Sequence, residues 1–442
     1  MKVILTRPVA KNATIEYMKK YVDKIKLLLF SATAKDTLVL FIGNGTSSFW
    51  GFLFTLIIAR AFTVYDFGIF SAALNLVVII SSLADIGIST GSINFVSEHV
   101  AKGEHEKANE YIKASFLIRL VVVLSISVLV AIFAPFVSKT FLATTDPKIA
   151  IWCAVLTIFL FPDAFFPSIL QAKKKFFHST LIDNVFYIAR LLFALGFFVI
   201  GGLTMSKAFW AFGAGFVVEV IIISVIFKGD FLRSKPQKKE YKSLLKYSGW
   251  IAVNRILSSI SGRLDVQMLA TMSGALVTGL YSIPSRLASF IAILIGSFSS
   301  VMAPRLASFG NKESERKYIL KSLLAVCGIT VPIILWVIVA KPFILILFGI
   351  KYLSSVPIFQ ALAIAYIPSL FTVPSVTAII YSMKKTVYIG VYAFFQIAVI
   401  FLLDLFLIPK FGVFGPTITL GVTNLIILIY SWVIVIKYYW LT

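Results

Sequence analysis

Hydrophobic residues fill long runs along the chain, and short polar stretches separate one run from the next. A run of about 20 apolar residues forms an α-helix long enough to cross the roughly 30 Å hydrocarbon core of a membrane. The pattern predicts twelve membrane-spanning helices, at residues 37–62, 68–96, 114–138, 147–171, 179–202, 207–228, 247–271, 276–302, 319–340, 355–382, 386–408 and 412–436. We therefore expect an all-α membrane protein.

The composition supports this interpretation and limits the chemistry. Of the 442 residues, 59% are hydrophobic and 14% are charged, and the mean hydropathy is +0.96. Soluble proteins carry about 25% charged residues. The chain contains no Walker loop, no G-x-S-x-G and no H-E-x-x-H motif, and its two cysteines, Cys153 and Cys327, lie in apolar runs. We expect no enzymatic activity, no cofactor and no metal.

Basic residues gather on one side of the predicted membrane topology. With the N-terminus in the cytoplasm, 29 of the 41 Lys and Arg residues fall in cytoplasmic segments, seven fall outside and five lie within spans. Since positively charged loops stay in the cytoplasm, we expect both termini there, on the inner side of the cell membrane. The same bias explains the formal net charge of +22 through contact with anionic lipids rather than with nucleic acid.

The first 36 residues are polar and precede the first predicted span. Ile15, Met18, Val22 and Ile25 recur in them at three- and four-residue spacing, and charged residues fill the opposite face. This pattern predicts an amphipathic helix that lies on the inner surface of the membrane.

Two pairs of similar stretches indicate an internal repeat. FGIFS at 67–71 matches TGLYS at 278–282, and EHEKANEYIKASFL at 104–117 resembles KESERKYILKSLLA at 313–326. Each stretch borders the second span of a six-span half, so the two halves are expected to run parallel. The predicted organisation is a cytoplasmic tail at 1–36, an N-terminal lobe at 37–228, a cytoplasmic linker at 229–246 and a C-terminal lobe at 247–442.

The chain resembles the Wzx-type polysaccharide flippases in three stretches: IARAFTVYDFGIFSAALNLVVIISSLADIGIS at 58–89, RLDVQMLATMSGALVTGLYSIPSRLASF at 263–290 and SSVMAPRLASF at 299–309. These flippases belong to a superfamily that also contains lipid II flippases and multidrug-extruding MATE antiporters. The resemblance implies two six-helix lobes around a central cavity that opens alternately to each side of the membrane. It also implies that the first, second, seventh and eighth helices line much of this cavity.

Six charged residues fall on these four helices, although a charge at the centre of a membrane costs at least about 2.5 to 3.5 kcal/mol. They are Arg60, Asp85, Arg255, Arg263, Asp265 and Arg286. Because Arg255 and Arg263 are eight residues apart, we expect them on one face of a continuous helix. Ser259 and Gln267 would share that face.

Arginine is suited to binding a phosphate, because its planar guanidinium group stays charged and donates two parallel hydrogen bonds. The six residues are therefore candidates to line the cavity and bind a polyprenyl (di)phosphate headgroup. Pairing of Arg with Asp to fix helix packing is the alternative for each of them. Arg60 lies at a helix end, where its side chain could simply extend to the membrane surface.

Charged residues on the other predicted helices are expected to serve packing. Arg190 and Glu219 lie at similar depth on consecutive antiparallel spans, which predicts an ion pair between them. Arg119 is close enough to the cytoplasm for its guanidinium group to reach water. Asp163 lies between two prolines that weaken its helix, and binding of a coupling cation there is an open alternative.

Three functions compete at this point. The first is transport of a lipid-linked oligosaccharide from the inner to the outer leaflet, beside glycosyltransferases or a polymerase of the same pathway. The second is cation-coupled export of drugs or metabolites, which would favour acidic and aromatic residues in the cavity. The third is a membrane glycosyltransferase or polymerase, but the predicted external connections are at most about 14 residues long. The excess of arginine over acidic residues on the four helices favours the first.

Overall fold

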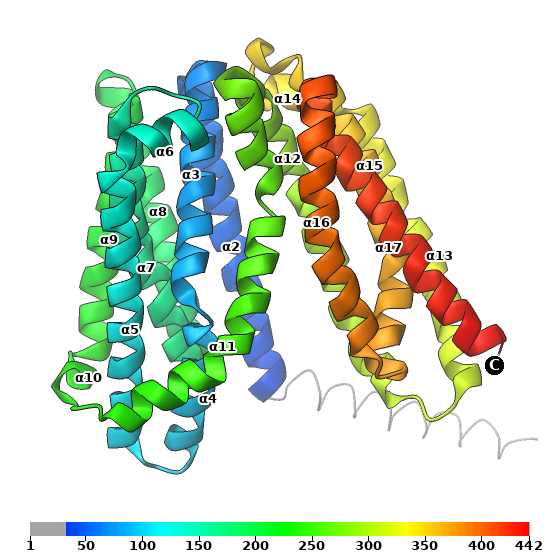
Figure 1. Cartoon of the computed structure of the whole chain (residues 1–442), viewed down its shortest axis with the longest axis horizontal. Coiled ribbons are helices and arrows are strands. Elements are labelled where there is room, and N and C mark those ends of the chain that lie inside the picture. The colour runs from blue at the N-terminus through cyan, green and yellow to red at the C-terminus, as the bar shows by residue number, and fades with distance from the viewer. Residues whose placement is uncertain (1–31, 442) are drawn as a thin grey trace, which may run out of the picture.

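The computed structural model describes residues 32–441, which contain helices and turns and no β-strand. The predicted amphipathic helix in the N-terminal tail lies outside the described residues. Within the described range, ten helical segments are long and apolar enough to cross a membrane. Two bundles of helices approach each other at one end of the molecule, the joined end, and diverge toward the open end, where the C-terminus lies (Figure 1).

The N-terminal bundle consists of long helices connected by short ones. The long helices are α2 (Ala32–Ala61), α3 (Val64–Asp85), α5 (His105–Ile132), α7 (Pro147–Ala172), α8 (Phe176–Gly201) and α9 (Met205–Phe227). The short helices are α4 (Ile88–Ala101), α6 (Ala134–Phe141) and α10 (Asp230–Arg233). The next helix, α11 (Lys238–Ser261), packs against α3, α4 and α5 of this bundle.

The C-terminal bundle is built in the same way. It contains α12 (Leu264–Ser308), α13 (Lys312–Ile338), α14 (Ala340–Phe348), α15 (Ser355–Thr377), α16 (Thr386–Phe411) and α17 (Gly415–Trp440). Short turns of helix join some of these elements: η1 (Ile350–Tyr352), η2 (Ala378–Ser382, a π-helical turn) and η3 (Gly412–Phe414).

Two of the helices that were predicted to be continuous are broken. The predicted span 68–96 is interrupted at Gly87, whose φ of 68° is left-handed and favours glycine. Within the predicted span 247–271, the helix α11 ends at Ser261 and the next helix, α12, begins at Leu264. The prediction of continuous helices was wrong at these places, because apolar periodicity does not report a local break in backbone conformation.

The 45 residues of α12 would extend for roughly 68 Å as a straight helix, which is more than twice the thickness of the hydrocarbon core. Gly274 has φ 82° and ψ 178°, so the backbone is non-helical there. The element is thus a short helix followed by a long one, and the long part corresponds to the predicted span 276–302.

The internal repeat predicted from the sequence is visible in the fold. The 28-residue α5 ends at Phe133 (φ −92°, ψ 22°) and is followed by the 8-residue α6. The 27-residue α13 ends at Val339 (φ −89°, ψ 9°) and is followed by the 9-residue α14. The similar stretches 104–117 and 313–326 lie at the starts of α5 and α13. A parallel repeat of two helical lobes is therefore confirmed.

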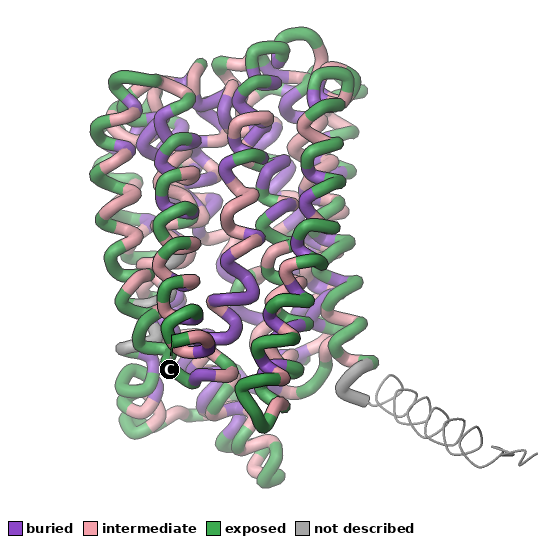
Figure 2. The backbone as a smooth tube through the Cα atoms, turned by 90° about the vertical axis from the view of Figure 1, so that its right-hand side faces the viewer, coloured by how far each residue is buried: buried purple, intermediate pink, exposed green. Residues whose placement is uncertain are grey.

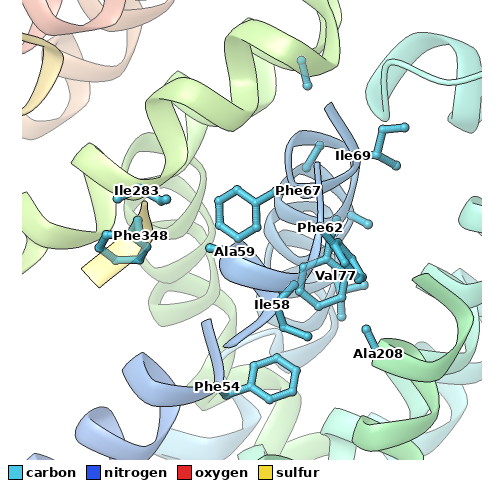
Figure 3. Packing of buried hydrophobic residues seen from close by; sticks show 14 of the residues in the cluster. Phe54, Ile58, Ala59, Phe62, Phe67, Ile69, Val77, Ala208, Ile283 and Phe348 are labelled. Carbon is cyan, nitrogen blue, oxygen red and sulfur yellow. The ribbon is translucent and has the colours of Figure 1, made fainter. Parts of the chain in front are cut away.

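The largest apolar core crosses from one bundle to the other. Its buried members include Phe67 of α3, Ile283 of α12 and Phe348 of α14, which Figure 3 shows within one cluster. The ring of Phe67 also meets that of Tyr352 edge to face, with 6.0 Å between centroids. Burial of aromatic rings thus holds the two bundles together at the joined end.

Large apolar side chains also cover the outside of the bundles. Val199 and Ile200 of α8 are 80% and 86% exposed, and many other Leu, Ile, Val and Phe side chains are exposed along the helices. Figure 2 shows that exposed positions recur along the outer faces of the helices and that buried positions gather toward the interior. This surface suits contact with lipid, and the chain is a multi-pass membrane protein.

Candidate functional site

A cavity of about 820 Å³ lies between the two bundles. Residues of α2, α3, α4, α5, α7, α8 and α9 form one wall, and residues from the end of α11 and from α12 form the other. The charged residues on the walls are Asp85, Arg119, Asp163, Arg190, Arg263, Asp265 and Arg286. The cavity between the two bundles is therefore lined by polar and charged side chains.

The structure places four of the six candidate residues on this cavity: Asp85, Arg263, Asp265 and Arg286. Arg60 is not among the lining residues. It lies at the joined end, where its guanidinium group contacts backbone carbonyls of α14. The side chain of Arg255 lies outside the described residues.

Arg263 and Asp265 lie at the break between α11 and α12. Arg263 is the N-cap residue of α12, with φ −137° and ψ 0°. Asp265 accepts a hydrogen bond from the backbone N–H of Val266 at 2.7 Å and another from the Tyr281 hydroxyl at 2.8 Å. The first N–H groups of a helix have no partner within the helix, and Asp265 accepts a hydrogen bond from one of them in α12. The partial positive charge at a helix N-terminus also favours a carboxylate there. The expected single helix face shared by Arg255 and Arg263 was wrong, because the helix breaks between them.

Asn75 of α3 connects this break to the N-terminal bundle. Its side-chain amide donates to the carbonyl of Arg263 at 2.9 Å, and Arg263 Nη1 donates to its Oδ1 at 3.4 Å. The same amide is 3.4 Å from Oε1 of Gln267. A residue of the N-terminal bundle therefore holds both the backbone and the guanidinium group of Arg263.

Arg190 faces aromatic rings rather than a carboxylate. The predicted ion pair with Glu219 was wrong: among residues 32–441 neither side chain forms an ion pair. The guanidinium carbon instead lies 4.1 to 5.4 Å from the centroids of four rings, those of Phe54, Phe186, Tyr187 and Phe212. Gly51 leaves room for it, since a Cβ there would lie 3.2 Å from Arg190 Nη2. We call these four rings and Arg190 the aromatic box.

Arg119 is buried and paired, so the expectation that it reaches water was wrong. It is 2% exposed, and its Nη1 lies 3.1 Å from Oδ1 of Asp85. The same nitrogen donates to the Ser89 hydroxyl at 2.9 Å and to the carbonyl of Ala164 at 3.0 Å. Asp85 also accepts from the backbone N–H of Ser89 at 3.2 Å. This network joins the break between α3 and α4 to α5 and α7.

Asp163 lines the cavity and also a smaller, adjoining one of about 340 Å³. Asp183 and Tyr187 of α8 line this second cavity too. Within the described part of the chain, Oδ1 of Asp163 and both carboxyl oxygens of Glu219 have no hydrogen-bond partner. The described residues contain no group of three His, Cys, Asp or Glu side chains that could hold a metal ion.

The cavity walls carry hydroxyl groups beside guanidinium groups that have no ion-pair partner among the described residues. Arg286 forms no side-chain hydrogen bond or ion pair with any described residue, and Arg190 and Arg263 form no ion pair with one. Serine hydroxyl groups lie around them, at Ser48, Ser71, Ser81, Ser82, Ser89, Ser259, Ser282, Ser285 and Ser289. Such walls can bind a multiply charged anion beside a polar, hydroxylated group.

A model of the family described as polysaccharide biosynthesis protein matches residues 33–310 of the chain, which is more than half of it. An uncharacterized membrane protein in the cps region of Klebsiella pneumoniae is 24% identical over 328 residues, 71% of this chain and 64% of that relative. The putative O-antigen transporter of Shigella flexneri is 21% identical over 382 residues, 82% of this chain and 88% of that relative.

Two solved structures share the fold. A multidrug resistance MATE family transporter of the MOP superfamily, in its inward-facing conformation, matches with a TM-score of 0.74 at 14% identity, over 87% of this chain and 93% of that one. The lipid II flippase MurJ, in an inward closed conformation, matches with a TM-score of 0.69 at 14% identity, over 90% and 87%. The chain therefore shares its overall fold with these two solved proteins.

Proposed function

The chain belongs to the polysaccharide biosynthesis protein family, and from that premise we propose that it moves a polyprenyl-(di)phosphate-linked oligosaccharide across the cell membrane by alternating access. The direction is from the cytoplasmic to the outer leaflet. The family and the structural neighbours are transporters rather than enzymes, so the chain supplies binding and movement without a reaction step. Glycosyltransferases or a polymerase of the same pathway are its proposed partners.

One observation carries the proposal: Arg190, Arg263 and Arg286 lie on the wall of one cavity, and none is ion-paired with a described residue. A charge buried in a membrane bundle without a counter-charge is costly, so such groups are retained where a ligand supplies the charge. A diphosphate carries compact negative charge that guanidinium groups bind through paired hydrogen bonds. The polyprenyl chain can remain in the lipid while the headgroup is in the cavity.

The orientation follows from the basic loops. The connection 228–246, with seven Lys and Arg residues, and the pair Lys384 and Lys385 belong to the open end, where the bundles diverge (Figure 1). The positive-inside rule assigns that end to the cytoplasm. We therefore propose that this conformation is the one that accepts substrate from the inner leaflet. We place the boundary between the lobes within residues 229–246, between α9 and the body of α11.

Cation-coupled export of drugs or metabolites remains a second candidate because of the carboxyl groups in the N-terminal bundle. Asp163 and Asp183 share the smaller cavity, and the carboxyl group of Glu219 is buried without a hydrogen-bond partner in the described residues. An exporter of organic cations would bind its substrate near these acids. Loss of function on removing arginine would not be expected for such a substrate.

The test is movement of a fluorescent polyprenyl-diphosphate oligosaccharide across proteoliposome membranes, with Arg263→Ala compared with the wild type. Arg305→Ala is the matched control, since Arg305 lies on the same helix but is exposed and away from the cavity. We expect movement in the wild type and in Arg305→Ala and its loss in Arg263→Ala. Movement that is unchanged in Arg263→Ala would remove that residue from the site. No movement in the wild type, with several glycan carriers and an imposed potential, would favour the exporter.

A further inference from the structure

Two cations at the joined end make reciprocal contacts between the bundles. Arg60, at the end of α2, donates from Nε to the carbonyl of Leu347 at 2.5 Å and from Nη2 to the carbonyl of Ile346, both in the last turn of α14. Lys351, in the turn after α14, donates to the carbonyls of Arg60 at 2.9 Å and of Phe62 at 2.5 Å. Each bundle thus sends one cation to the end of a helix of the other.

These contacts have a clear physical basis. The last four carbonyl groups of an α-helix have no partner within the helix, and the C-terminus carries a partial negative charge. The helix α2 ends at Ala61 and α14 ends at Phe348, so Arg60 and Lys351 reach the unsatisfied carbonyls of the opposite helix. Charge-assisted hydrogen bonds of this kind are stronger than neutral ones. Together, Arg60 and Lys351 donate hydrogen bonds to carbonyl groups at the C-termini of α14 and α2, each from the opposite lobe.

We propose that Arg60 and Lys351 form a latch that holds the two lobes together at the outer side and thereby sets the balance between the two access states. The inference rests on the alternating access proposed above. For the cavity to open outward, both cations must leave their carbonyl partners. Three of the four hydrogen bonds are exposed, and the fourth, from Lys351 to the carbonyl of Phe62, is partly buried. Water can therefore replace most of the lost hydrogen bonds, and the latch can reopen.

The latch is also limited in strength. Burial lowers the pKa of the Lys351 amine below its ordinary value, and the nearby Arg60 cation lowers it further. The two like charges therefore repel each other while each is held by carbonyl groups. The hydrogen bonds to the helix C-termini stabilise the latch, and the repulsion between Arg60 and Lys351 weakens it. This balance suits a contact that forms and breaks reversibly.

A reading in which Arg60 only extends to the membrane surface does not account for these contacts. Surface anchoring requires one cation in water, whereas both Arg60 and Lys351 bind backbone carbonyls of the opposite bundle. Lys139 and Lys341 are exposed at the same end and make no hydrogen bond or ion pair with a described residue. Unlike these two lysines, Arg60 and Lys351 therefore connect the two bundles.

The experiment measures the distance between the outer ends of the lobes by pulsed electron paramagnetic resonance, with the protein in lipid nanodiscs. The background carries Cys153→Ala and Cys327→Ala. Spin labels are attached through Thr145→Cys, in the exposed loop before α7, and Lys410→Cys, at the exposed end of α16. A second pair, Glu106→Cys and Lys317→Cys, reports the opposite ends of the same lobes.

The test variant combines Arg60→Ala with Lys351→Ala. We expect the ratio of outward-open to outward-closed molecules to rise by about tenfold, from the loss of two charged contacts to helix C-termini. The outer distance should lengthen and the inner distance should shorten in the same fraction of molecules. Arg60→Lys, which keeps a charged donor, should restore part of the closed population in the presence of Lys351.

Lys207→Ala is the matched control. Lys207 donates to the carbonyl of Gly202 at 2.9 Å, at the end of α8, so it makes the same kind of contact within one lobe. Its removal should leave both distance distributions as in the wild type. A double variant with wild-type distributions would overturn the latch. So would a longer outer distance without a shorter inner one, because that result means local displacement of α14.

The distances need no substrate, so this result is separable from the proposed transport. If the distributions shift but the wild type moves no lipid-linked oligosaccharide, the latch stands and the substrate assignment fails. If the wild type moves the substrate and the double variant keeps the wild-type distributions, the transport assignment stands and the latch is overturned.

Discussion

Gly68 and Gly279 occupy matching positions in the two halves of the chain, and each packs directly against the backbone of the other's helix. A Cβ atom on Gly68 would lie 1.8 Å from the carbonyl oxygen of Ala275, and one on Gly279 would lie 2.0 Å from that of Val64. Val64 and Ala275 each precede their own glycine by four residues. The contact is therefore reciprocal, as expected at a two-fold interface, although both partners belong to one chain.

This crossing predicts that Gly68→Ala prevents full closure of the joined end. The added methyl group cannot fit against a backbone carbonyl, and overpacking of this kind costs about 1–3 kcal/mol. We expect a lower thermal unfolding midpoint in detergent and a longer outer spin-label distance. Gly296→Ala in α12 is the control, because a Cβ there meets no atom within 4 Å. Equal midpoints and equal distances for Gly68→Ala and the wild type would show that the lobes do not need this close approach.

The reciprocal glycines show how much of the fold the sequence predicts. Apolar runs of the right length located the membrane helices, and the match of 67–71 with 278–282 identified the repeat that places these two glycines together. Both signals are local or periodic, so they can be recognised from a single sequence without an alignment. The positions of helix breaks at Gly87 and Gly274 do not follow from periodicity, because glycine also occurs within continuous membrane helices.

The candidate site was predicted less completely, for a geometric reason. The predicted ion pair of Arg190 with Glu219 rested on their similar depth in the membrane on neighbouring helices. Depth does not determine how each helix is rotated about its axis, so it does not determine which side chains face each other. The neighbours of Arg190 gave a usable signal: Phe186 and Tyr187 precede it by four and three residues and therefore lie on the same helix face. The partners Asp85 and Arg119 come from separate helices, and no spacing rule connects them.

The aromatic box predicts that Arg190→Lys behaves nearly as Arg190→Ala. A guanidinium group stacks flat on rings and presents a planar fork to phosphate, whereas an ammonium group meets both only as a point charge. The stacking alone contributes about 0.5–2 kcal/mol, so we expect transport of the polyprenyl-diphosphate substrate to fall by roughly tenfold or more in both variants. Initial rates in proteoliposomes measure this, at equal amounts of folded protein.

The control for the box is Arg305→Ala, an exposed arginine away from the cavity. It should transport at the wild-type rate. If Arg190→Lys keeps the wild-type rate, then charge alone is sufficient at this position and the planar geometry of the box has no role in transport.

The buried pair of Asp85 and Arg119 predicts strong coupling in stability. Breaking a buried ion pair by removing one partner costs about 3–5 kcal/mol. We expect Arg119→Ala and Asp85→Asn each to lower the free energy of unfolding on this scale, and the double variant to cost less than their sum. Chemical unfolding in detergent gives the double-mutant cycle. Additive effects would mean that the 3.1 Å contact contributes nothing of its own.

An exposed lysine serves as the reference for that cycle. Lys148→Ala, at the start of α7, changes a charge on the surface and should alter stability by no more than about 0.5 kcal/mol. A large effect there would point to a general sensitivity to charge rather than to the buried pair.

The proposed anionic substrate predicts that the membrane potential drives export. Each net negative charge that moves outward across a potential of 100 mV, negative inside, gains about 2.3 kcal/mol. At equilibrium this corresponds to a shift of roughly 50-fold per charge in the distribution between leaflets. A potassium gradient with valinomycin sets the potential in proteoliposomes, with proton and sodium gradients collapsed, and the label in each leaflet is then measured. Equal distributions with and without the potential would show that no net charge crosses with the substrate. If a proton or sodium gradient alone drives movement, the energy enters through the carboxyl groups, and Asp163 and Asp183 in the smaller cavity are then the residues to replace.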